Sequence, residues 1–476
     1  MKTGGSFSKD MLKLVSGFSI VQLLNLLAAP LLTRLYSPES FGAVALFISI
    51  TSIISAIACM RYELAIVLPE DDEEAANIFV LSLVISVMIT IVTAVVVILG
   101  RNIILDLLDI TILSPYLYLI PIAVQLTGIS MALSYWSSRK KRFGTLSVSK
   151  VGGSLAMTAV ALGGGVAGIA THGTMIGSNL AGQLVSMIIL GMKSWRDDWR
   201  YAVATVRWRA ISAGMKRHRN FPLYSSWSAL LNVLSWQLPV FLLSMFFSPT
   251  VVGYYSFGFR ILQLPMNLIG SAISQVFFQR AAEARHDGKL AVLVEDLFRR
   301  LVMFGLFPML MLTIAGRDLY RLVFGENWSE AGVYTQILGL WAFLWFISSP
   351  LSTLFAVLEK QDFGFKLNIV LLATRLLSLV LGGFLGNARL SLILFSLTGI
   401  LIYGYLCYAI MAHAGVARKA VVTVILDGLK PILPFLVVQL VVQLVSQDIW
   451  QKNISVGILS VLYLAYLYKK QVKGSG

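Results

Sequence analysis

Long apolar runs alternate with short polar segments along almost the whole chain. Fourteen of these runs approach or exceed the about 20 apolar residues that a helix needs to cross a bilayer. We therefore predict an all-α integral membrane protein with about 14 transmembrane helices. The predicted spans are residues 12–34, 42–68, 77–100, 113–136, 146–170, 173–192, 222–247, 251–279, 298–322, 331–358, 364–385, 388–412, 428–446 and 449–468.

The positive charges between the runs predict the orientation of the chain. Lys and Arg collect on the cytoplasmic side of membrane proteins. If the N-terminus lies in the cytoplasm, the cytoplasmic segments hold 28 Lys and Arg residues and the opposite side holds six. We therefore predict that both termini are cytoplasmic.

The composition agrees with a membrane protein and argues against other classes. Hydrophobic residues make up 57% of the chain and charged residues 13%, whereas a soluble domain carries about 25% charged residues. The asymmetry of the loops accounts for the net charge of +15, so we expect contact with membrane lipids and none with nucleic acid. Cys59 and Cys407 both fall inside apolar runs, so we predict no disulfide framework, no metal site and no cofactor.

One short motif occurs twice, 211 residues apart. Residues 37–42 read SPESFG and residues 248–253 read SPTVVG, and each motif lies between two apolar runs. Six predicted spans separate the motifs, so both lie on the same side of the membrane, which predicts two pseudo-symmetric six-helix bundles. The predicted organisation is an N-lobe at 1–194, a cytoplasmic interfacial linker at 195–221, a C-lobe at 222–415, and two further helices with a tail at 416–476.

Three predicted spans carry a polar or small face at helical spacing. Such a face either packs against another helix or lines a water-filled cavity. We weigh the two readings equally for the first and seventh spans, and we favour a cavity for the eighth because Arg260 would be hard to satisfy in a dry interface. The faces include Asn25 in the first span, Ser225, Ser228 and Asn232 in the seventh, and Gly253, Ser256, Arg260, Gln263, Asn267, Gly270 and Ser274 in the eighth.

Ionisable residues deep in the predicted spans indicate an anionic substrate. Arg61, Arg260 and Arg375 outnumber the single deep carboxylate, Glu63. Arginine suits phosphate because its planar fork donates two parallel hydrogen bonds. Two residues apart on one helix, Arg61 and Glu63 would point in nearly opposite directions, so we expect one to face a cavity and the other to pair with a neighbouring helix. The sequence leaves open which residue does which.

The strings themselves resemble a known family. TRLYSPESFG (33–42) and RYELAIVLP (61–69) are similar to the start of the Wzx-type oligosaccharide flippases, and residues 220–284 and 322–352 are similar to their second lobe. These flippases belong to the multidrug/oligosaccharidyl-lipid/polysaccharide (MOP) exporter superfamily. The resemblance implies two bundles in a V around a central cationic cavity. It also implies a protein of the bacterial inner membrane that moves undecaprenyl-pyrophosphate-linked repeat units from the cytoplasmic to the periplasmic leaflet by alternating access.

The depth of these charges and the polar helix faces assign candidate roles to the residues, and the cationic cavity implied by the resemblance agrees with the arginines. Substrate contact is expected from Arg260, Arg61, Arg375, Gln263, Asn267, Asn232 and Asn25. Glu63 is the candidate for H⁺ or Na⁺ coupling, although a salt bridge to a neighbouring helix is as good a reading. The expected partners are the lipid-linked oligosaccharide, membrane lipids, a polysaccharide polymerase and a chain-length regulator.

Three other functions stay open at this point. A lipid II flippase shares the fourteen spans and the anionic cargo, and an ion-coupled multidrug exporter shares the superfamily but needs more membrane acids than Glu63. A membrane glycosyl polymerase or ligase would need paired carboxylates and a large outer loop. We interpret the acidic pairs at 71–72 and 197–198 as solvated helix caps. We therefore predict a transporter and no enzyme.

Overall fold

A computed structural model of the protein describes residues 4–108, 110–267 and 271–474. These residues form helices joined by short turns, and no strand occurs among them, as the sequence predicts. The chain divides into two compact units, residues 1–253 and residues 254–476. Each unit is described separately below.

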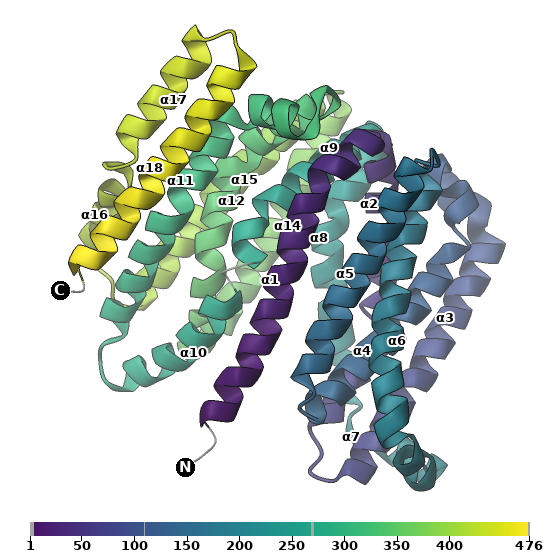
Figure 1. The fold of residues 1–476 in the computed structure, drawn as a ribbon. Helices are drawn as coiled ribbons and strands as arrows, with labels where there is room; N and C mark the ends of the chain where they lie inside the picture. Colours follow the sequence, from purple (N-terminus) through teal and green to yellow (C-terminus); the bar gives the residue numbers. More distant parts are fainter. Residues whose placement is uncertain (1–3, 109, 268–270, 475–476) are drawn as a thin grey trace. The chain divides into compact units, whose positions relative to one another are not determined.

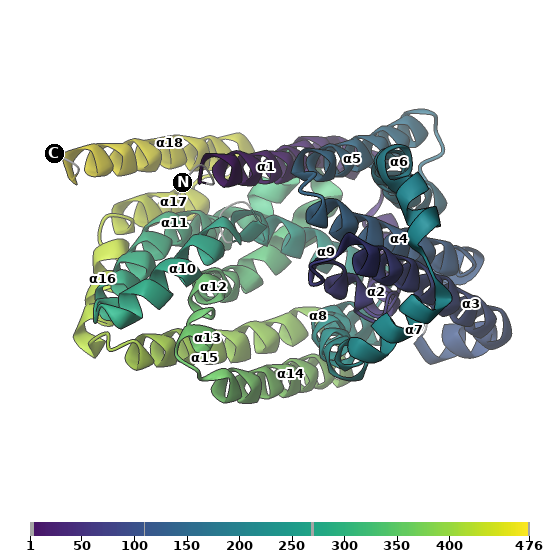
Figure 2. The same cartoon turned by 90° about the horizontal axis from the view of Figure 1, so that it is seen from below.

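The first unit holds the N-terminal helices (Figures 1 and 2). Within it, α2 packs against α4, α6 and α8, while α5 packs against both α1 and α6. The elements are α1 (Gly4–Leu35), α2 (Pro38–Ser55), the 3₁₀ helix η1 (Tyr62–Val67), α3 (Asp72–Leu108), η2 (Thr111–Tyr116), α4 (Leu119–Arg139), α5 (Phe143–Val166), α6 (His172–Thr205), α7 (Trp208–Arg217), the π-helical η3 (Phe221–Ser225), α8 (Ser226–Phe246) and the first turn of α9 (Pro249–Leu262).

The second unit is built on α11, which packs against α12 and against the three last helices. The C-terminal helices α16, α17 and α18 lie beside α11 in both views (Figures 1 and 2). After the remainder of α9 the elements are α10 (Ser271–His286), α11 (Leu290–Phe324), η5 (Glu326–Trp328), α12 (Ser329–Leu351), α13 (Leu354–Val357), α14 (Gln361–Phe384), α15 (Ala388–His413), α16 (Arg418–Leu429), α17 (Leu433–Val445) and α18 (Ile449–Gly474).

Many of these helices are long and apolar enough to cross a membrane. Eleven qualify within the described residues, or twelve if α16 and α17, which are bent by 50° at a short break, form one span. The remaining predicted spans fall on the interrupted pair α9 and α10 and on α18. The protein is therefore a multi-pass membrane protein, and the count of fourteen is compatible with the structure without being confirmed by it.

The predicted continuous helix over 42–68 is wrong. Helix α2 ends at Ser55, and turns lead into η1. Met60 and Arg61 have φ angles of 48° and 61°, in the left-handed region that an α-helix does not use. Hydropathy could not predict this break, because it measures the apolar character of a segment and not its backbone conformation.

The predicted helix over 251–279 is interrupted as well. Helix α9 ends at Leu262, and α10 begins at Ser271. Gln263 forms a turn and residues 266–267 are π-helical, with Pro265 between them; proline distorts helices because it lacks an N–H and its ring clashes with the preceding turn. The predicted polar face is thus not one continuous six-turn surface. Gly270 and the side chain of Ser274 lie outside the described part of the chain.

The two copies of the repeated motif are helix starts that meet within residues 1–253. Ser37 caps α2 and Ser248 caps α9, in each case by accepting a hydrogen bond from a backbone N–H three residues on. A Cβ placed on Gly42 would lie 1.7 Å from the Pro249 carbonyl oxygen, and one on Gly253 would lie 1.9 Å from that of Pro38. The contact is reciprocal, so each glycine is needed because the other helix start approaches its backbone directly.

Candidate functional site

A cavity of about 880 Å³ lies within the first unit, against α2. It is bounded by α2 and the turn after it, by α4 and α6, and by η3 and α8. The lining residues are Ile48, Thr51, Ser52, Ser55, Ala56, Arg61, Leu64, Thr127, Met131, Asn179, Gln183, Tyr224, Ser225, Ser228, Ala229, Asn232 and Val233.

The lining is polar on several sides. On α2 the lining positions 48, 51, 52 and 55 follow the helical repeat and form one face. Across the cavity, Thr127 donates to the Gln183 Oε1 atom at 3.3 Å, and Gln183 donates to the Asn179 Oδ1 atom at 2.9 Å. Hydroxyl and amide groups of this kind bind sugar hydroxyls and phosphate oxygens, since they both donate and accept hydrogen bonds.

Arg61 carries the one formal charge among the lining residues that the structure describes. Its partner is Glu63, and the Arg61 Nη1 and Glu63 Oε1 atoms are 3.5 Å apart. The prediction that these side chains point in opposite directions is therefore wrong, because the left-handed turn at Arg61 replaces the helix on which it rested. The structure also settles which residue faces the cavity: the Arg61 side chain is 29% exposed, whereas Glu63 is fully buried.

The pair is incompletely satisfied. Within the described part of the chain, neither carboxylate oxygen of Glu63 accepts a hydrogen bond, and the Arg61 Nε atom donates none. Burial raises the pKa of Glu63 above its ordinary value, and the guanidinium of Arg61 partly opposes this shift. Burial therefore favours the neutral, protonated form of this carboxyl group more than it is favoured in an exposed glutamate.

This buried acid predicts a pH-dependent stability. A raised pKa in the folded state means that the folded protein holds this proton more tightly, so stability falls as pH rises through that pKa. Each unit of upward shift is worth about 1.4 kcal/mol. We expect melting temperatures measured between pH 5 and pH 9 to fall less steeply for Glu63→Gln than for the wild type. Equal slopes would show that Glu63 is ionised in the folded protein throughout this range.

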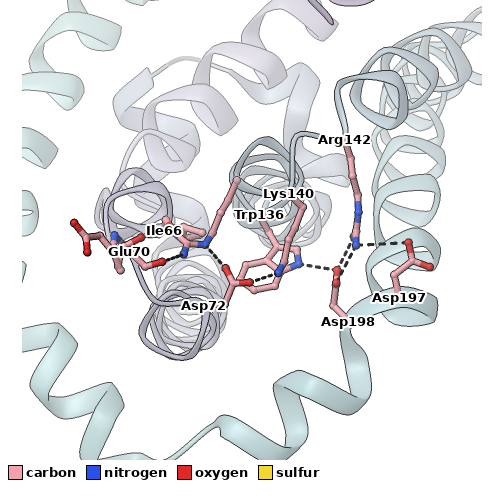
Figure 3. A network of polar contacts seen from close by, with 10 residues as sticks. Ile66, Glu70, Asp72, Trp136, Lys140, Arg142, Asp197 and Asp198 are labelled. Atoms are coloured by element: carbon pink, nitrogen blue, oxygen red, sulfur yellow. Dashed lines mark hydrogen bonds and ion pairs between the residues drawn. The ribbon is translucent and has the colours of Figure 1, made fainter. Parts of the chain in front are cut away.

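The segment from the end of η1 to the start of α3 is held by the end of α4 (Figure 3). Arg139 at the end of α4 donates to the carbonyl oxygens of Ile66, Pro69 and Glu70 at 3.2, 2.6 and 3.3 Å. Its Nε atom also donates to Asp72 at 2.9 Å. A single side chain thus satisfies three carbonyl groups of an irregular segment and fixes the path of the chain beyond η1.

A second ion-pair group joins α4, α5 and α6 (Figure 3). Arg142 donates to both carboxylate oxygens of Asp198, at 2.5 and 2.9 Å, and Trp136 donates to Asp198 at 2.9 Å. In the first group, Lys140 contacts the Asp72 oxygen that Arg139 leaves free, at 2.6 Å. The interpretation of these acids as solvated caps is therefore wrong for Asp197 and Asp198: both lie inside α6, Asp197 pairs with Lys193, and Asp198 receives a bidentate arginine.

The Arg142–Asp198 pair predicts a measurable loss on disruption. Charge-assisted bidentate hydrogen bonds of half-buried groups are worth about 2 kcal/mol. Asp198→Asn should lower the melting temperature of the purified protein, and the nearby exposed control Lys141→Gln should not. If both variants melt alike, the pair contributes nothing to stability.

The predicted site residues separate into three groups. Arg61 and Asn232 line the cavity together. Asn25 instead projects from α1 toward α5, where its Oδ1 atom accepts a hydrogen bond from the Ser154 hydroxyl at 3.5 Å. The remaining four belong to the second unit. Arg260 and Asn267 are exposed, Gln263 is half-buried, and buried Arg375 donates to the Tyr403 hydroxyl at 3.0 Å.

Sequence reasoning missed several polar lining residues, among them Thr127, Asn179 and Gln183. Asn179 and Gln183 are four residues apart on α6, so a polar stripe was readable in the sixth predicted span. Thr127 carries no comparable signal, because a single hydroxyl in an apolar helix is ordinary.

Solved structures share this fold over most of their length. The lipid II flippase MurJ in an inward closed conformation gives a TM-score of 0.72 at 12% identity, covering 96% of this chain and 99% of that chain. An inward-facing multidrug resistance MATE family transporter of the MOP superfamily gives 0.60 at 16% identity, covering 88% and 94%. The chain is thus a multi-pass membrane protein that shares its fold with the flippase MurJ and with this MATE family transporter.

A family model narrows this class further. The model described as polysaccharide biosynthesis protein matches residues 31–333, more than half of the chain. The chain therefore belongs to the polysaccharide biosynthesis protein family, which confirms the family resemblance of its sequence.

Curated relatives agree with this assignment. The succinoglycan biosynthesis transport protein ExoT of Rhizobium meliloti (strain 1021) is 25% identical over 72% of this chain and 66% of its own length. The teichuronic acid biosynthesis protein TuaB of Bacillus subtilis (strain 168) is 23% identical over 38% of each chain. An uncharacterized membrane protein in the cps region of Klebsiella pneumoniae is 20% identical over 48% of this chain and 47% of its own length. The chain thus matches less than two thirds of the length of these relatives.

Proposed function

We propose that this protein is a flippase for undecaprenyl-pyrophosphate-linked oligosaccharide repeat units in surface polysaccharide biosynthesis. It works by alternating access and moves the repeat unit from the cytoplasmic to the periplasmic leaflet of the bacterial inner membrane, with both termini in the cytoplasm. The polymerase and the chain-length regulator of the same pathway are the proposed partners.

The cavity of the first unit is the observation that carries the proposal. It combines a volume of about 880 Å³ with a lining of hydroxyl and amide groups and one cation, Arg61. Sugars need many hydrogen-bonding groups, and a pyrophosphate needs a cation that donates several hydrogen bonds. A cavity for cationic drugs would instead need carboxylates in its wall. Glu63 does not meet this need, because its side chain is fully buried and paired with Arg61.

The proposal extends to the second unit through Arg260. Its exposed guanidinium has no ion pair among the described residues and is available to an anion. Arg375 is a weaker candidate because it is buried and already donates to Tyr403. Gln263 and Asn267 follow Arg260 along the chain as candidate contacts.

Coupling is proposed to run through the Arg61–Glu63 pair. When the pyrophosphate binds Arg61, the guanidinium turns to the stronger anion and Glu63 loses its counter-charge. A buried carboxylate without a counter-charge takes up a proton, or binds Na⁺, instead of staying ionised alone. Substrate binding and ion binding are then linked through one side chain.

Complementation tests the function. A strain that makes the repeat unit but lacks its own flippase accumulates the lipid-linked unit and shows no surface polymer. We expect this chain to restore surface polysaccharide and to lower the accumulated intermediate. Proteoliposomes should show the matching gain of external sugar, measured with a membrane-impermeant glycosidase.

The same proteoliposomes separate the alternatives. Transport of lipid II but not of the repeat unit would make the protein a lipid II flippase, and export of a cationic dye would make it a multidrug exporter. Polymer formed without translocation would point to a polymerase or ligase.

A further inference from the structure

A second, apolar cleft of about 250 Å³ lies on the other face of α2 from the polar cavity. Helix α2 contributes Ile50 and Ile54, and Ile57 follows in the turn. Leu117 and Ile120 close the cleft at the start of α4, and α3 supplies its longest wall through Ile89, Val92, Thr93, Val96, Val97 and Ile104.

The α3 wall is a continuous stripe. Its positions 89, 92, 93, 96, 97 and 104 share one helical face. Thr93 is the single residue with a polar side chain in this lining, and its hydroxyl donates to the Ile89 carbonyl oxygen at 2.7 Å. The wall therefore offers an occupant no free hydrogen-bond donor, and its apolar lining suits a hydrocarbon chain.

The cleft has a buried floor and an open rim. Val97, Leu117 and Ile120 are at most 4% exposed, whereas Val92 and Val96 are 57% and 52% exposed. Because α3 is a membrane-spanning helix, the open rim faces the hydrocarbon of the bilayer.

The side chain of Arg101 provides a positive charge at one end of this stripe. Arg101 follows Val97 by one helical turn and precedes Ile104 on the same face. It is half-buried and donates from Nη2 to Ser114 of η2. Its Nε atom has no acceptor within the described part of the chain, and no carboxylate pairs with it there. A half-buried guanidinium with an unused donor can bind an anion.

We propose that the cleft and Arg101 together bind one glycerophospholipid of the bilayer. The phosphate accepts hydrogen bonds from Arg101, and one acyl chain lies along α3 as far as Ile89. The twelve residues from Ile89 to Arg101 span about 18 Å of helix, close to the about 15 Å of half a hydrocarbon core. Arg101 is about 10 Å from the end of α3 at Leu108, so its guanidinium reaches the headgroup level by extending along the helix.

The bilayer phospholipid fits better than the transported lipid. The cleft and the polar cavity share no lining residue, and α2 separates them. A lipid whose sugar and pyrophosphate occupy the cavity therefore does not present its phosphate to Arg101. The inference also stands apart from the proposed function, because it needs only a membrane-spanning α3.

Photolabelling in proteoliposomes tests the site. The full-length protein is reconstituted with phosphatidylglycerol that carries a photoactivatable acyl chain, and a parallel sample receives a photoactivatable polyprenyl pyrophosphate. Labelled peptides are mapped by mass spectrometry. We expect the phospholipid to label residues 50–57 and 89–97, and the polyprenyl probe to leave them unlabelled.

Two variants and their matched controls decide the outcome. Val96→Trp fills the rim, and Arg101→Gln removes the cation; each should lower labelling about tenfold, the factor that corresponds to about 1.4 kcal/mol. Val95→Trp, on the neighbouring exposed face of α3, and Arg34→Gln, an exposed cation of α1, should leave labelling unchanged. If Val96→Trp and Val95→Trp are labelled equally, the label comes only from lipid that surrounds the protein without a defined site. If only the polyprenyl probe labels the cleft, the cleft belongs to the substrate. Either result overturns the proposal, and melting curves of all four variants establish that each is folded.

Discussion

Arg61→Ala should abolish polysaccharide export, with at least about a hundredfold loss of transport in proteoliposomes. Two charge-assisted hydrogen bonds to a pyrophosphate, at about 1.5 kcal/mol each, correspond to about this factor. Arg61→Lys should keep a fraction of the activity, because lysine retains the charge but loses the planar fork. Transport is measured as the rate at which the sugar becomes accessible outside the vesicle.

The design must separate binding from folding. Removing Arg61 leaves Glu63 buried without its counter-charge, which by itself destabilises the protein. The double variant Arg61→Ala/Glu63→Gln removes this penalty, so it should recover the melting temperature and expression level but not transport. Full transport by the double variant would show that Arg61 only neutralises Glu63. Arg209→Ala, an exposed cation of α7, serves as the control for net charge.

Gly42→Ala should destabilise the protein strongly, and Gly253→Ala should do the same. A methyl group at either position meets a backbone carbonyl oxygen of the other helix start, at 1.7 and 1.9 Å. Backbone gives way less easily than a flexible side chain, so we expect the upper end of the about 1 to 3 kcal/mol that overpacking costs. Thermal unfolding of the purified proteins is the measurement.

The same substitution in an open position provides the control. A Cβ at Gly163 in α5 has no neighbour within 4 Å, so Gly163→Ala should be neutral or stabilising by about 0.5 to 1 kcal/mol through helix propensity. If Gly42→Ala behaves like Gly163→Ala, the two helix starts do not touch in the native protein. The double variant Gly42→Ala/Gly253→Ala should lose less than the sum of the singles, because a helix start displaced by the first methyl already makes room for the second.

The sequence predicts most of the helices of this fold because their apolar runs are long. It also marks the repeated motif, although nothing in the two strings indicates that Gly42 and Gly253 would touch. The two breaks, after Ser55 and after Leu262, differ in this respect. Pro265 signals the second, whereas the first depends on left-handed residues that carry no glycine or proline to announce them.

The candidate site could be predicted only where its residues lie on regular helices. Residues on one regular helix, such as Ser228 and Asn232, can be placed on a common face from their spacing. The Arg61–Glu63 pair could not be predicted, because the two residues come together through an irregular turn at Met60 and Arg61, and the segment after this turn is held by Arg139 from another helix. Long-range contacts of this kind leave no local pattern in the chain.

Helix α2 lines two different spaces. Its hydroxyl side chains face the polar cavity, and Ile50 and Ile54 face the apolar cleft. Adding one residue near its middle would turn every later position by about 100° relative to those before it. The isoleucines after the insertion would then rotate toward the polar cavity and the hydroxyls toward the apolar cleft, and Arg61 would no longer line the cavity. Homologous chains should therefore vary freely in the identity of individual α2 residues but show almost no insertions or deletions between the capping serine and the arginine.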